Sequence, residues 1–384
     1  MADTTIMRRT NLQTILEAID RLGSATTQDL TDATQLSLAT ISRVTGQLKT
    51  NGLILQDRKQ TSEPGRKPEI YRLNRRHATS LYFNLKTGSL QGYLLDFGGQ
   101  VLATVEDAVS PALTTEDFLL LIRQQKKRLS ATDTSLPTPM AVYLTLPGQQ
   151  DRADGTICRI PNFPSFEGAD LRQMMQQALE LPCLIGNTAR ITAWGHFLAR
   201  KNDVRNLIFL EITGDCGIGA GLVLGGRLYE DSAGLAGEVG DMIVQIKERS
   251  AAENRGALEE DAGLMSVLQK AHTLLSGAEL RDLEAAATSG NEAILSLLHS
   301  ATRSWAAAIV NLCAVLSPDK IVVGGAISEE NTLIRNLIDR HLKAMYYRPV
   351  CVAFTPRGCL CHTEGAADLL KDFLFCQELD HIDE

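Results

Sequence analysis

The sequence has no hydrophobic run long enough to cross a lipid bilayer. In its 384 residues, the longest nearly apolar stretch, Ala306 to Leu316, is eleven residues long and contains Asn311, whereas a spanning helix needs about 20 apolar residues. The first ten residues, MADTTIMRRT, contain no apolar stretch of the kind that a signal peptide has. We therefore expect a soluble cytoplasmic protein that makes no use of a membrane.

A disulfide framework is also missing, because the eight cysteines are scattered along the chain. Most lie in apolar surroundings, where a free cysteine behaves as a small hydrophobic residue. The one cluster is Cys359, Cys361 and His362, and no Cys/His pair near it in the sequence completes a metal site. The sequence favours a reduced structural cluster over a metal site at this position.

The overall composition is that of a globular protein, with 44% hydrophobic and 22% charged residues. These values exclude a disordered or collagen-like chain, and the length predicts two or three domains. The net charge of −8 is unevenly distributed, because residues 1–77 contain twelve Lys/Arg and eight Asp/Glu. A segment of net charge +4 on a body of −12 is what a nucleic-acid-binding protein needs, although a chance excess of four charges is the alternative.

The spacing of apolar residues in this basic segment predicts three helices. Residues 11–21 place aliphatic side chains on one helical face. Thr26 and Asp29 have the spacing of a capping box that opens a short second helix. Ser37 is the expected N-cap of a third helix, which runs to about Thr50. Helix, short helix, tight turn and helix is the arrangement of a helix-turn-helix motif.

In the third helix, one face is apolar and the other is small or polar. The expected buried stripe is Leu38, Ile41, Val44 and Leu48. The residues expected to face a DNA groove are Ser37, Ala39, Thr40, Arg43 and Gln47.

A predicted hairpin follows, with strands at residues 53–56 and 69–73 and a basic tip at residues 58–68. The tip has no apolar residue to bury, as in the wing of a winged helix, so we expect Arg66 and Lys67 to contact DNA. The alternative is a three-helix interaction module that binds no DNA.

Beyond residue 77, a strand meander occurs twice. Strands near residues 81–85, 93–96 and 101–105 are repeated near residues 207–212, 222–224 and 228, and the glycine turns are offset by 127 positions. Each meander precedes a helical stretch and a further buried strand. Two such copies predict two α/β lobes with a ligand cleft between them.

The stretch from Ile212 to Val244, ITGDCGIGAGLVLGGRLYEDSAGLAGEVGDMIV, resembles the glycine-rich second phosphate loop and the following G-x-x-G-E-x-G-H segment of the ROK family. This family includes sugar kinases and sugar-responsive repressors, and the repressors carry an added winged helix with a segment similar to Gly65-Arg66-Lys67-Pro68. The resemblance implies an α/β fold with an N-terminal winged helix-turn-helix and a two-lobed, actin-like (ribonuclease-H-like) ROK domain. We expect the winged helix at residues 1–77, the first lobe at 78–190, and the second lobe, with oligomerisation helices, at 191–384.

Kinase chemistry needs a carboxylate base, and groups that hold Mg²⁺ and phosphate. The family's first phosphate loop, D-x-G-G-T, corresponds here to a segment that starts at Asn84, and the family's N-D sugar motif corresponds to Asn187-Thr188. A threonine hydroxyl is no base near neutral pH, so we expect no kinase activity. The glycines that remain in the second loop, residues 213–221, also serve as a simple turn.

The resemblance also implies that the family's structural zinc is lost. The family's four ligand positions, one His and three Cys, correspond to Asp241, Ser250, Ala252 and Ala257. We expect no zinc there and no other cofactor.

Several polar residues match family positions that contact a sugar. The expected effector residues are Gln149, Asn187, Thr188, Glu238, Asp241 and Glu259. Carboxylates and amides suit a polyol, because ionised carboxylates accept hydrogen bonds from hydroxyl groups strongly. The alternative is that these residues only cap helices or pair with arginines.

The resulting hypothesis is a regulator, most simply a repressor, of carbohydrate-use genes. Its partners would be a double-stranded DNA operator, a sugar or sugar phosphate, and further copies of itself in a homodimer or homotetramer. Two alternatives stay open: a kinase-like interaction protein without catalysis, and an active sugar kinase with rebuilt catalytic groups.

Overall fold

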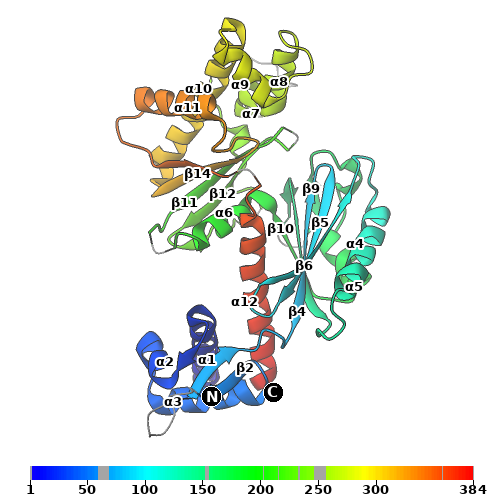
Figure 1. Cartoon of the computed structure of the whole chain (residues 1–384), viewed down its shortest axis with the longest axis vertical. Helices are drawn as coiled ribbons and strands as arrows, with labels where there is room; N and C mark the ends of the chain where they lie inside the picture. The colour runs from blue at the N-terminus through cyan, green and yellow to red at the C-terminus, as the bar shows by residue number, and fades with distance from the viewer. Residues whose placement is uncertain are drawn as a thin grey trace.

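Three parts follow one another along the chain in the computed structural model (Figure 1). It describes residues 2–58, 69–151, 155–201, 203–214, 216–231, 234–245, 257–356 and 358–383. The first part is a small domain of three helices and a three-stranded sheet in the order β1-β3-β2. Its elements are α1 (Ala2–Leu22), β1 (Ala25–Thr26), α2 (Thr27–Thr34), α3 (Leu38–Thr50), β2 (Ile54–Arg58) and β3 (Glu69–Leu73).

Two of the helix starts in this domain are fixed by the predicted caps. The Thr26 hydroxyl accepts from the Asp29 amide, and the Asp29 carboxylate accepts from the Thr26 amide at 2.8 Å, so the capping box is complete. The Ser37 hydroxyl accepts from the Thr40 amide and caps α3. Each cap satisfies backbone donors that have no partner inside the helix.

The buried stripe of α3 differs from the prediction at one position. Leu38 is 58% exposed, whereas Ile41, Val44 and Leu48 are fully buried. Leu38 is the first residue of the helix and lies beyond the edge of the core. The fourth buried residue of α3 is Thr45. Thr45 is buried, and its hydroxyl donates to the Ile41 carbonyl at 2.8 Å, which satisfies the polar group.

The predicted duplication is confirmed by the sheets. The first lobe has the strand order β10-β7-β4-β5-β6 and the second has β13-β12-β11-β14-β15, so both have the same topology. In the first lobe, β4 pairs antiparallel with β5 and parallel with β7. In the second lobe, β11 pairs in the same way with β12 and β14. The first-lobe elements are β4 (Thr79–Lys86), β5 (Ser89–Asp96), β6 (Val101–Ala108), α4 (Thr115–Ser130), β7 (Pro139–Leu146), β8 (Gln149–Gln150), β9 (Ile157–Arg159), η1 (Pro164–Phe166), α5 (Leu171–Leu179) and β10 (Cys183–Asn187).

The second lobe adds helices mainly to one face of its sheet. Its elements are α6 (Thr188–Leu198), β11 (Leu207–Ile212), β12 (Ile218–Leu224), β13 (Arg227–Leu228), η2 (Val239–Asp241), α7 (Ala257–Ala262), α8 (Leu264–His272), α9 (Leu280–Thr288), α10 (Glu292–Leu316), β14 (Lys320–Gly325), α11 (Thr332–Met345) and β15 (Val352–Phe354). The last helix of the chain is α12 (Cys361–Asp383).

Among the described residues, α10 is long and apolar enough to span a bilayer by length and average composition, which differs from the expectation because that expectation counted uninterrupted apolar residues only. Half of its most apolar window is buried, and Trp305 and Ile309 lie in the core of the second lobe. The predicted apolar run from Ala306 to Leu316 is the C-terminal part of this helix.

Helix α6 lies on one face of the second-lobe sheet, helix α12 lies on one face of the first-lobe sheet, and the two helices pack against each other. On β11, Leu207 and Phe209 contact α6, whereas Ile208 and Leu210 face α10 and its neighbours. On the first-lobe sheet, Tyr82 shares a hydrophobic cluster with α12. Side chains on a strand alternate between the two faces, so each sheet has two cores.

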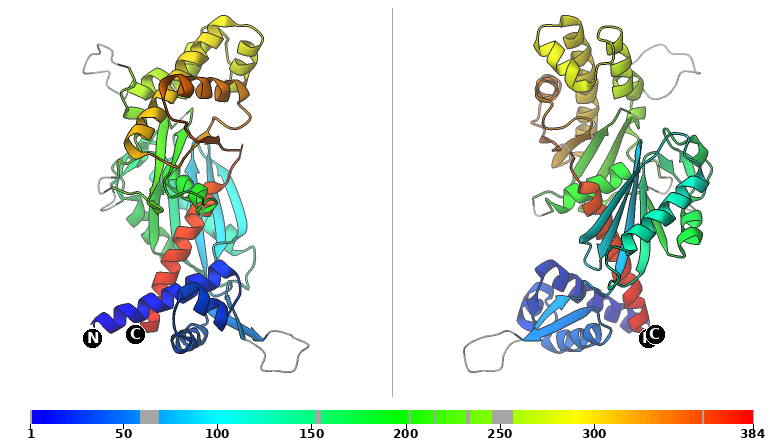
Figure 2. Two further views of the ribbon diagram at one scale, coloured as in Figure 1. Left: turned by 90° about the vertical axis from the view of Figure 1, so that its left-hand side faces the viewer. Right: turned by 45° about the vertical axis from the view of Figure 1, so that its right-hand side comes forward.

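The expected boundary at residue 191 assigns α12 to the second lobe, but its contacts extend further. Leu370, Leu374 and Phe375 of α12 join one buried cluster with the first-lobe sheet and the N-terminal domain. The helix begins near the second lobe and ends beside α1, so the chain termini lie close together (Figures 1 and 2). The N-terminal domain is therefore packed on the body through α12.

The crossing of α6 and α12 depends on two glycines. A Cβ on Gly195 would lie 1.8 Å from the Cys361 carbonyl oxygen, and one on Gly365 would lie 2.2 Å from the Ile191 carbonyl oxygen. Neither position has room for a side chain, so the two helices approach backbone to backbone and pack as one unit.

Candidate functional site

The lobes enclose a polar cleft of about 220 Å³ at the point where the first-lobe sheet meets α6. Its walls come from the segments that follow β7 and β10 on one side, and from the β11–β12 turn, η2 and α7 on the other. The lining includes Pro147, Gly148, Gln149, Arg159, Asn187, Glu211, Thr213, Gly217, Glu238, Gly240, Asp241 and Glu259. A polar cleft between two lobes is suited to a small hydrophilic ligand.

Five of the six predicted effector residues line this cleft: Gln149, Asn187, Glu238, Asp241 and Glu259. Gln149 and Glu238 come from different lobes, and the Gln149 amide nitrogen donates to the Glu238 carboxylate at 3.0 Å. This hydrogen bond joins the two walls directly.

Asn187 begins α6 at the edge of the cleft. Its side-chain oxygen accepts from the Arg190 amide at 3.2 Å and caps the helix, while its nitrogen donates to the Gly148 carbonyl at 2.9 Å. Asn187 therefore has a structural role as well as a place in the lining, and it connects the cleft to the start of α6.

Glu259, on α7, is held by the second-lobe turn. Its Oε2 accepts from the Ile218 amide at 2.6 Å. A Cβ on Gly217 would lie 2.7 Å from that oxygen, and one on Gly263 would lie 2.2 Å from Oε1. The glycines at these positions make room for the carboxylate.

Burial raises the pKa of Glu238 and of Glu259 above its usual value. The charge of Asp241 raises both pKa values further, while Arg159 acts in the opposite direction. Arg159 is a lining residue that could not be predicted from the sequence, because a single arginine at the end of a short strand has no distinguishing pattern. Among the residues that the structure describes, the lining carries four carboxylates and one guanidinium, so this part of the cleft is electronegative.

Thr188, the sixth predicted residue, is not among the lining residues. Its hydroxyl lies 3.5 Å from the side-chain oxygen of Asn84, which also accepts from the Thr145 hydroxyl at 2.9 Å. Tyr82 bonds to Thr145 at 2.8 Å and to His362 at 3.0 Å. The two positions that the family fills with acids thus face each other inside a neutral hydrogen-bonded network.

Asn84 is fully buried, and its Nδ2 has no hydrogen-bond partner among the residues that the structure describes. An ionised carboxylate in this position would be costly without a bound cation. Two of the glycines that remain in the second loop have packing roles: a Cβ on Gly217 would collide with Glu259, and one on Gly221 would lie 2.4 Å from the Ala189 carbonyl oxygen.

A second candidate site is the outer face of α3. Ser37, Ala39 and Arg43 are exposed, and Thr40 and Gln47 are half-buried. Arg66 and Lys67 lie outside the described residues. The exposed face of α3 is mostly small or polar and carries a guanidinium, and the apolar Leu38 at the start of the helix is exposed as well.

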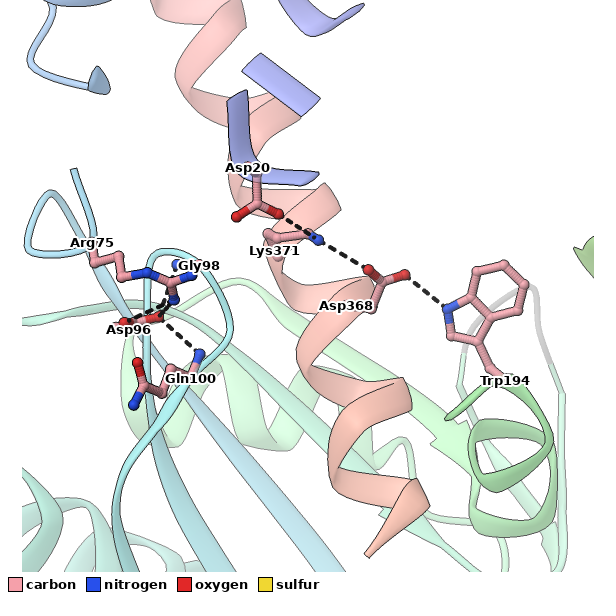
Figure 3. Close-up of polar contacts among 8 residues, drawn as sticks. All are labelled: Asp20, Arg75, Asp96, Gly98, Gln100, Trp194, Asp368 and Lys371. Atoms are coloured by element: carbon pink, nitrogen blue, oxygen red, sulfur yellow. Dashed lines mark hydrogen bonds and ion pairs between the residues drawn. The ribbon is translucent and has the colours of Figure 1, made fainter. Parts of the chain in front are cut away.

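Polar contacts connect the N-terminal domain to α6 through α12 (Figure 3). Lys371 lies 3.0 Å from Asp20 of α1 and 3.0 Å from Asp368, and the Trp194 indole of α6 donates to Asp368 at 2.9 Å. Burial alone would lower the pKa of Lys371, but the two carboxylates raise it above its usual value. Lys371 is therefore charged and shared between the two domains.

A second connection lies at the base of the N-terminal domain. Arg75 pairs with the buried Asp96 at 3.3 Å, and Asp96 also accepts from the Gly98 and Gln100 amides (Figure 3). His77 pairs with Glu378 of α12 at 2.9 Å.

A comparison with protein families matches residues 89–372 to the ROK family. A xylose repressor of Bacillus spizizenii is 23% identical over 353 residues, covering 90% of this chain and 90% of its own. The Escherichia coli DNA-binding transcriptional dual regulator NagC is also 23% identical, over 347 residues, covering 87% of this chain and 84% of its own.

Solved structures share the fold. A ROK family transcriptional regulator, described as a homologue of the Escherichia coli MLC protein, matches with a TM-score of 0.81 and 22% identity, over 97% of this chain and 99% of its own. A ROK hexokinase from Thermus thermophilus matches with a TM-score of 0.64 and 20% identity, over 78% of this chain and 99% of its own. About a fifth of this chain thus has no counterpart in the hexokinase.

Proposed function

The chain belongs to the ROK family, and from this we propose that it is a transcriptional repressor of carbohydrate-use genes. In this proposal, residues 1–77 form a winged helix-turn-helix that binds an operator. A sugar in the interlobe cleft then weakens or re-orients that binding.

The observation that carries the proposal is the N-terminal domain itself. It has the order helix, short helix, turn, helix and hairpin, and it is basic while the rest of the chain is acidic. The regulator structure matches 97% of the chain, whereas the hexokinase leaves out about the share that this domain occupies. A kinase has no evident use for such a domain, and a DNA-binding protein requires one.

For DNA recognition, we propose that α3 enters the major groove with Thr40, Arg43 and Gln47 toward the bases. Ser37 and Ala39, at the start of the helix, would approach the phosphate backbone. Arg66 and Lys67 would contact phosphate or an A/T-rich minor groove. Two copies in a homodimer or homotetramer would read two half-sites.

For the effector, the electronegative lining supports an uncharged sugar over a sugar phosphate. Glu211, Glu238, Asp241 and Glu259 would repel a phosphate group, and Arg159 is the one opposing charge among the lining residues that the structure describes. The same carboxylates accept hydrogen bonds from sugar hydroxyl groups.

We propose that the chain does not phosphorylate this sugar. A kinase needs a base on the attacking hydroxyl group and an anchor for Mg²⁺. Thr188 and Asn84 supply neither: the side-chain oxygen of Asn84 accepts hydrogen bonds from the hydroxyl groups of Thr188 and Thr145 within the protein.

The family's structural zinc does not fit this chain either. Asp241 lines the cleft, Ser250 and Ala252 lie outside the described residues, and Ala257 has no donor atom. Serine and alanine are not zinc ligands of the usual kind. No step of the proposed function uses a metal.

The two sites would be coupled through α6 and α12. Asn187 caps α6 at the cleft, Trp194 joins α6 to Asp368 of α12, and Lys371 joins α12 to Asp20 of the N-terminal domain. Closure of the lobes on a sugar would shift this unit and change the population of DNA-binding arrangements.

The test combines two measurements on the full chain. Operator sequences are selected from random duplex DNA, and the affinity of the selected duplex is measured over a range of salt concentrations. A thermal-shift screen then uses free sugars and sugar phosphates, because a ligand stabilises the state it binds. We expect a sequence preference, a steep salt dependence, and stabilisation by a free sugar that also changes operator affinity.

If no duplex is preferred over random sequence, the repressor proposal is wrong, and a kinase-like interaction protein replaces it. Turnover of ATP in the presence of the stabilising sugar would instead support the kinase alternative.

A further inference from the structure

A cluster of three soft metal ligands lies where α6 meets the start of α12. It consists of His196 on α6, Cys359, and Cys361 at the first position of α12, and the ligand atoms of the three lie within 4.8 Å of one another. His196 is 2% exposed, and the two cysteines are half-buried. None of the three lines the interlobe cleft.

The atoms converge on a common point. The Cys359 and Cys361 sulfur atoms are 2.8 Å apart, and the Cys361 sulfur lies 3.5 Å from Nδ1 of His196. Arg200 approaches the same Nδ1 at 3.4 Å and donates to the His196 carbonyl at 3.0 Å. A guanidinium is only a donor, so the lone pair of His196 is at Nδ1 and is directed toward Arg200 and the cysteines.

The neighbouring His362 takes no part in this cluster. Its Nδ1 bonds to the Tyr82 hydroxyl at 3.0 Å, inside the first-lobe network. The residue adjacent in sequence therefore points elsewhere, and a histidine 165 positions away from Cys361 completes the set.

We propose that His196, Cys359 and Cys361 form a binding site for a thiophilic divalent cation, with Zn²⁺ as the best match. Two thiolates and one neutral imidazole are a common zinc ligand set, with water completing a tetrahedron. Binding converts two thiols to zinc thiolates and releases two protons, so the bound unit is electrically neutral. No electron is transferred.

The geometry needs only a small adjustment. With Zn–S bonds of about 2.3 Å, two sulfur atoms of a tetrahedral site lie about 3.8 Å apart. Rotation of the half-buried Cys359 side chain can supply the additional separation. Arg200 would give up its contact with Nδ1 while keeping its bond to the His196 carbonyl.

A metal bound here would link α6 to the start of α12, near the point where the two helices cross at Gly195 and Gly365. A Cβ on Gly195, the residue before His196, would collide with the Cys361 carbonyl, so the backbones are already in place before a metal binds. Preorganised ligands reduce the ordering cost of binding. The bound ion would therefore stabilise the unit of α6 and α12 against separation.

The test uses the full chain, freed of metal by a chelator and kept reduced with a phosphine. Zn²⁺ is added, unbound metal is removed by gel filtration, and metal is counted by elemental analysis. Co²⁺ is added in a parallel experiment, because a thiolate-to-cobalt charge-transfer band and tetrahedral ligand-field bands identify the ligands. We expect one ion per chain, both spectral signatures, and a higher melting temperature with Zn²⁺.

Four variants separate this site from other cysteines and histidines. His196→Gln and Cys361→Ser should each weaken zinc binding by at least 100-fold, because even loss of a residue that only orients a ligand costs about 10- to 100-fold. His362→Gln and Cys376→Ser should bind zinc as the wild type does. Circular dichroism of each metal-free variant checks that it folds.

Retention of stoichiometric metal in folded His196→Gln would overturn the proposal, as would the absence of tight binding in the reduced wild type. Loss of binding in folded His362→Gln, with His196→Gln unaffected, would assign the metal to the residues adjacent in sequence and contradict the spatial cluster.

Discussion

Replacement of Lys371 by methionine removes an ammonium group of α12 that pairs with Asp20 of α1 and with Asp368 of α12. The side chains of Lys371, Asp20 and Asp368 are 17%, 13% and 19% exposed, so all three are largely removed from water. Removal of the ammonium group leaves two carboxylates close together without their cation. For fully buried pairs such a loss costs about 3–5 kcal/mol, and the remaining exposure reduces our expectation for Lys371→Met to about 2–4 kcal/mol.

The assay is urea unfolding of the full chain followed by circular dichroism. The double-mutant cycle of Asp20→Asn and Lys371→Met should show a coupling free energy of about 1–3 kcal/mol. Lys343→Met is the matched control, because Lys343 and Asp339 form an ion pair that is 75% and 60% exposed. Exposed pairs within a helix contribute only about 0.3–0.5 kcal/mol.

Lys371→Met should also reduce the effect of the sugar on operator affinity while leaving sugar binding intact, since the variant lies outside the cleft. Equal stability of Lys371→Met and Lys343→Met, together with additive effects in the cycle, would refute the reasoning that Lys371 joins the two domains.

Three further predictions concern the proposed sites. Arg43→Ala should relax sequence preference at one operator position at a cost of about 1–3 kcal/mol, measured with a panel of substituted duplexes. Because burial raises the pKa of Glu238 and Glu259, and only the ionised forms accept strongly, sugar affinity should be constant at high pH. It should fall as the pH decreases, starting above the pH at which an exposed carboxylate titrates; calorimetry over a pH series measures this, and a pH-independent affinity would contradict it. Thr188→Asp should show no ATP-dependent sugar phosphorylation in a coupled assay, because Asn84 still lacks a carboxylate for the metal.

Local signals predicted much of the fold. The caps at Thr26 and Ser37 depend on residues three positions apart, and the strand meanders depend on alternation and glycine turns, so both can be read from neighbouring residues. Leu38 was assigned to the wrong face because periodicity gives the direction of a side chain but not where the core ends. The contacts of α12 beyond the second lobe were missed because they join residues that are distant in sequence.

The candidate cleft was predicted residue by residue only through resemblance to a family. The family resemblance assigned Gln149 and Glu238 to the same ligand site, and in the structure a hydrogen bond joins their side chains. It gave no sign of Arg159. Nor did it indicate that His196 meets Cys359 and Cys361, because packing of α6 on α12 brings together residues that are distant in sequence.

Operator binding by the wild type and by Glu238→Ala, with and without the best free sugar from the screen, tests the central claim most directly. Loss of a charge-assisted hydrogen bond worth about 1.5–3 kcal/mol should make the variant need roughly 10- to 150-fold more sugar for the same response. Its operator affinity without sugar should equal that of the wild type, because Glu238 lies in the cleft and not in the DNA-binding domain. A Glu238→Ala protein that responds at the wild-type sugar concentration would contradict the assignment of the cleft as the effector site.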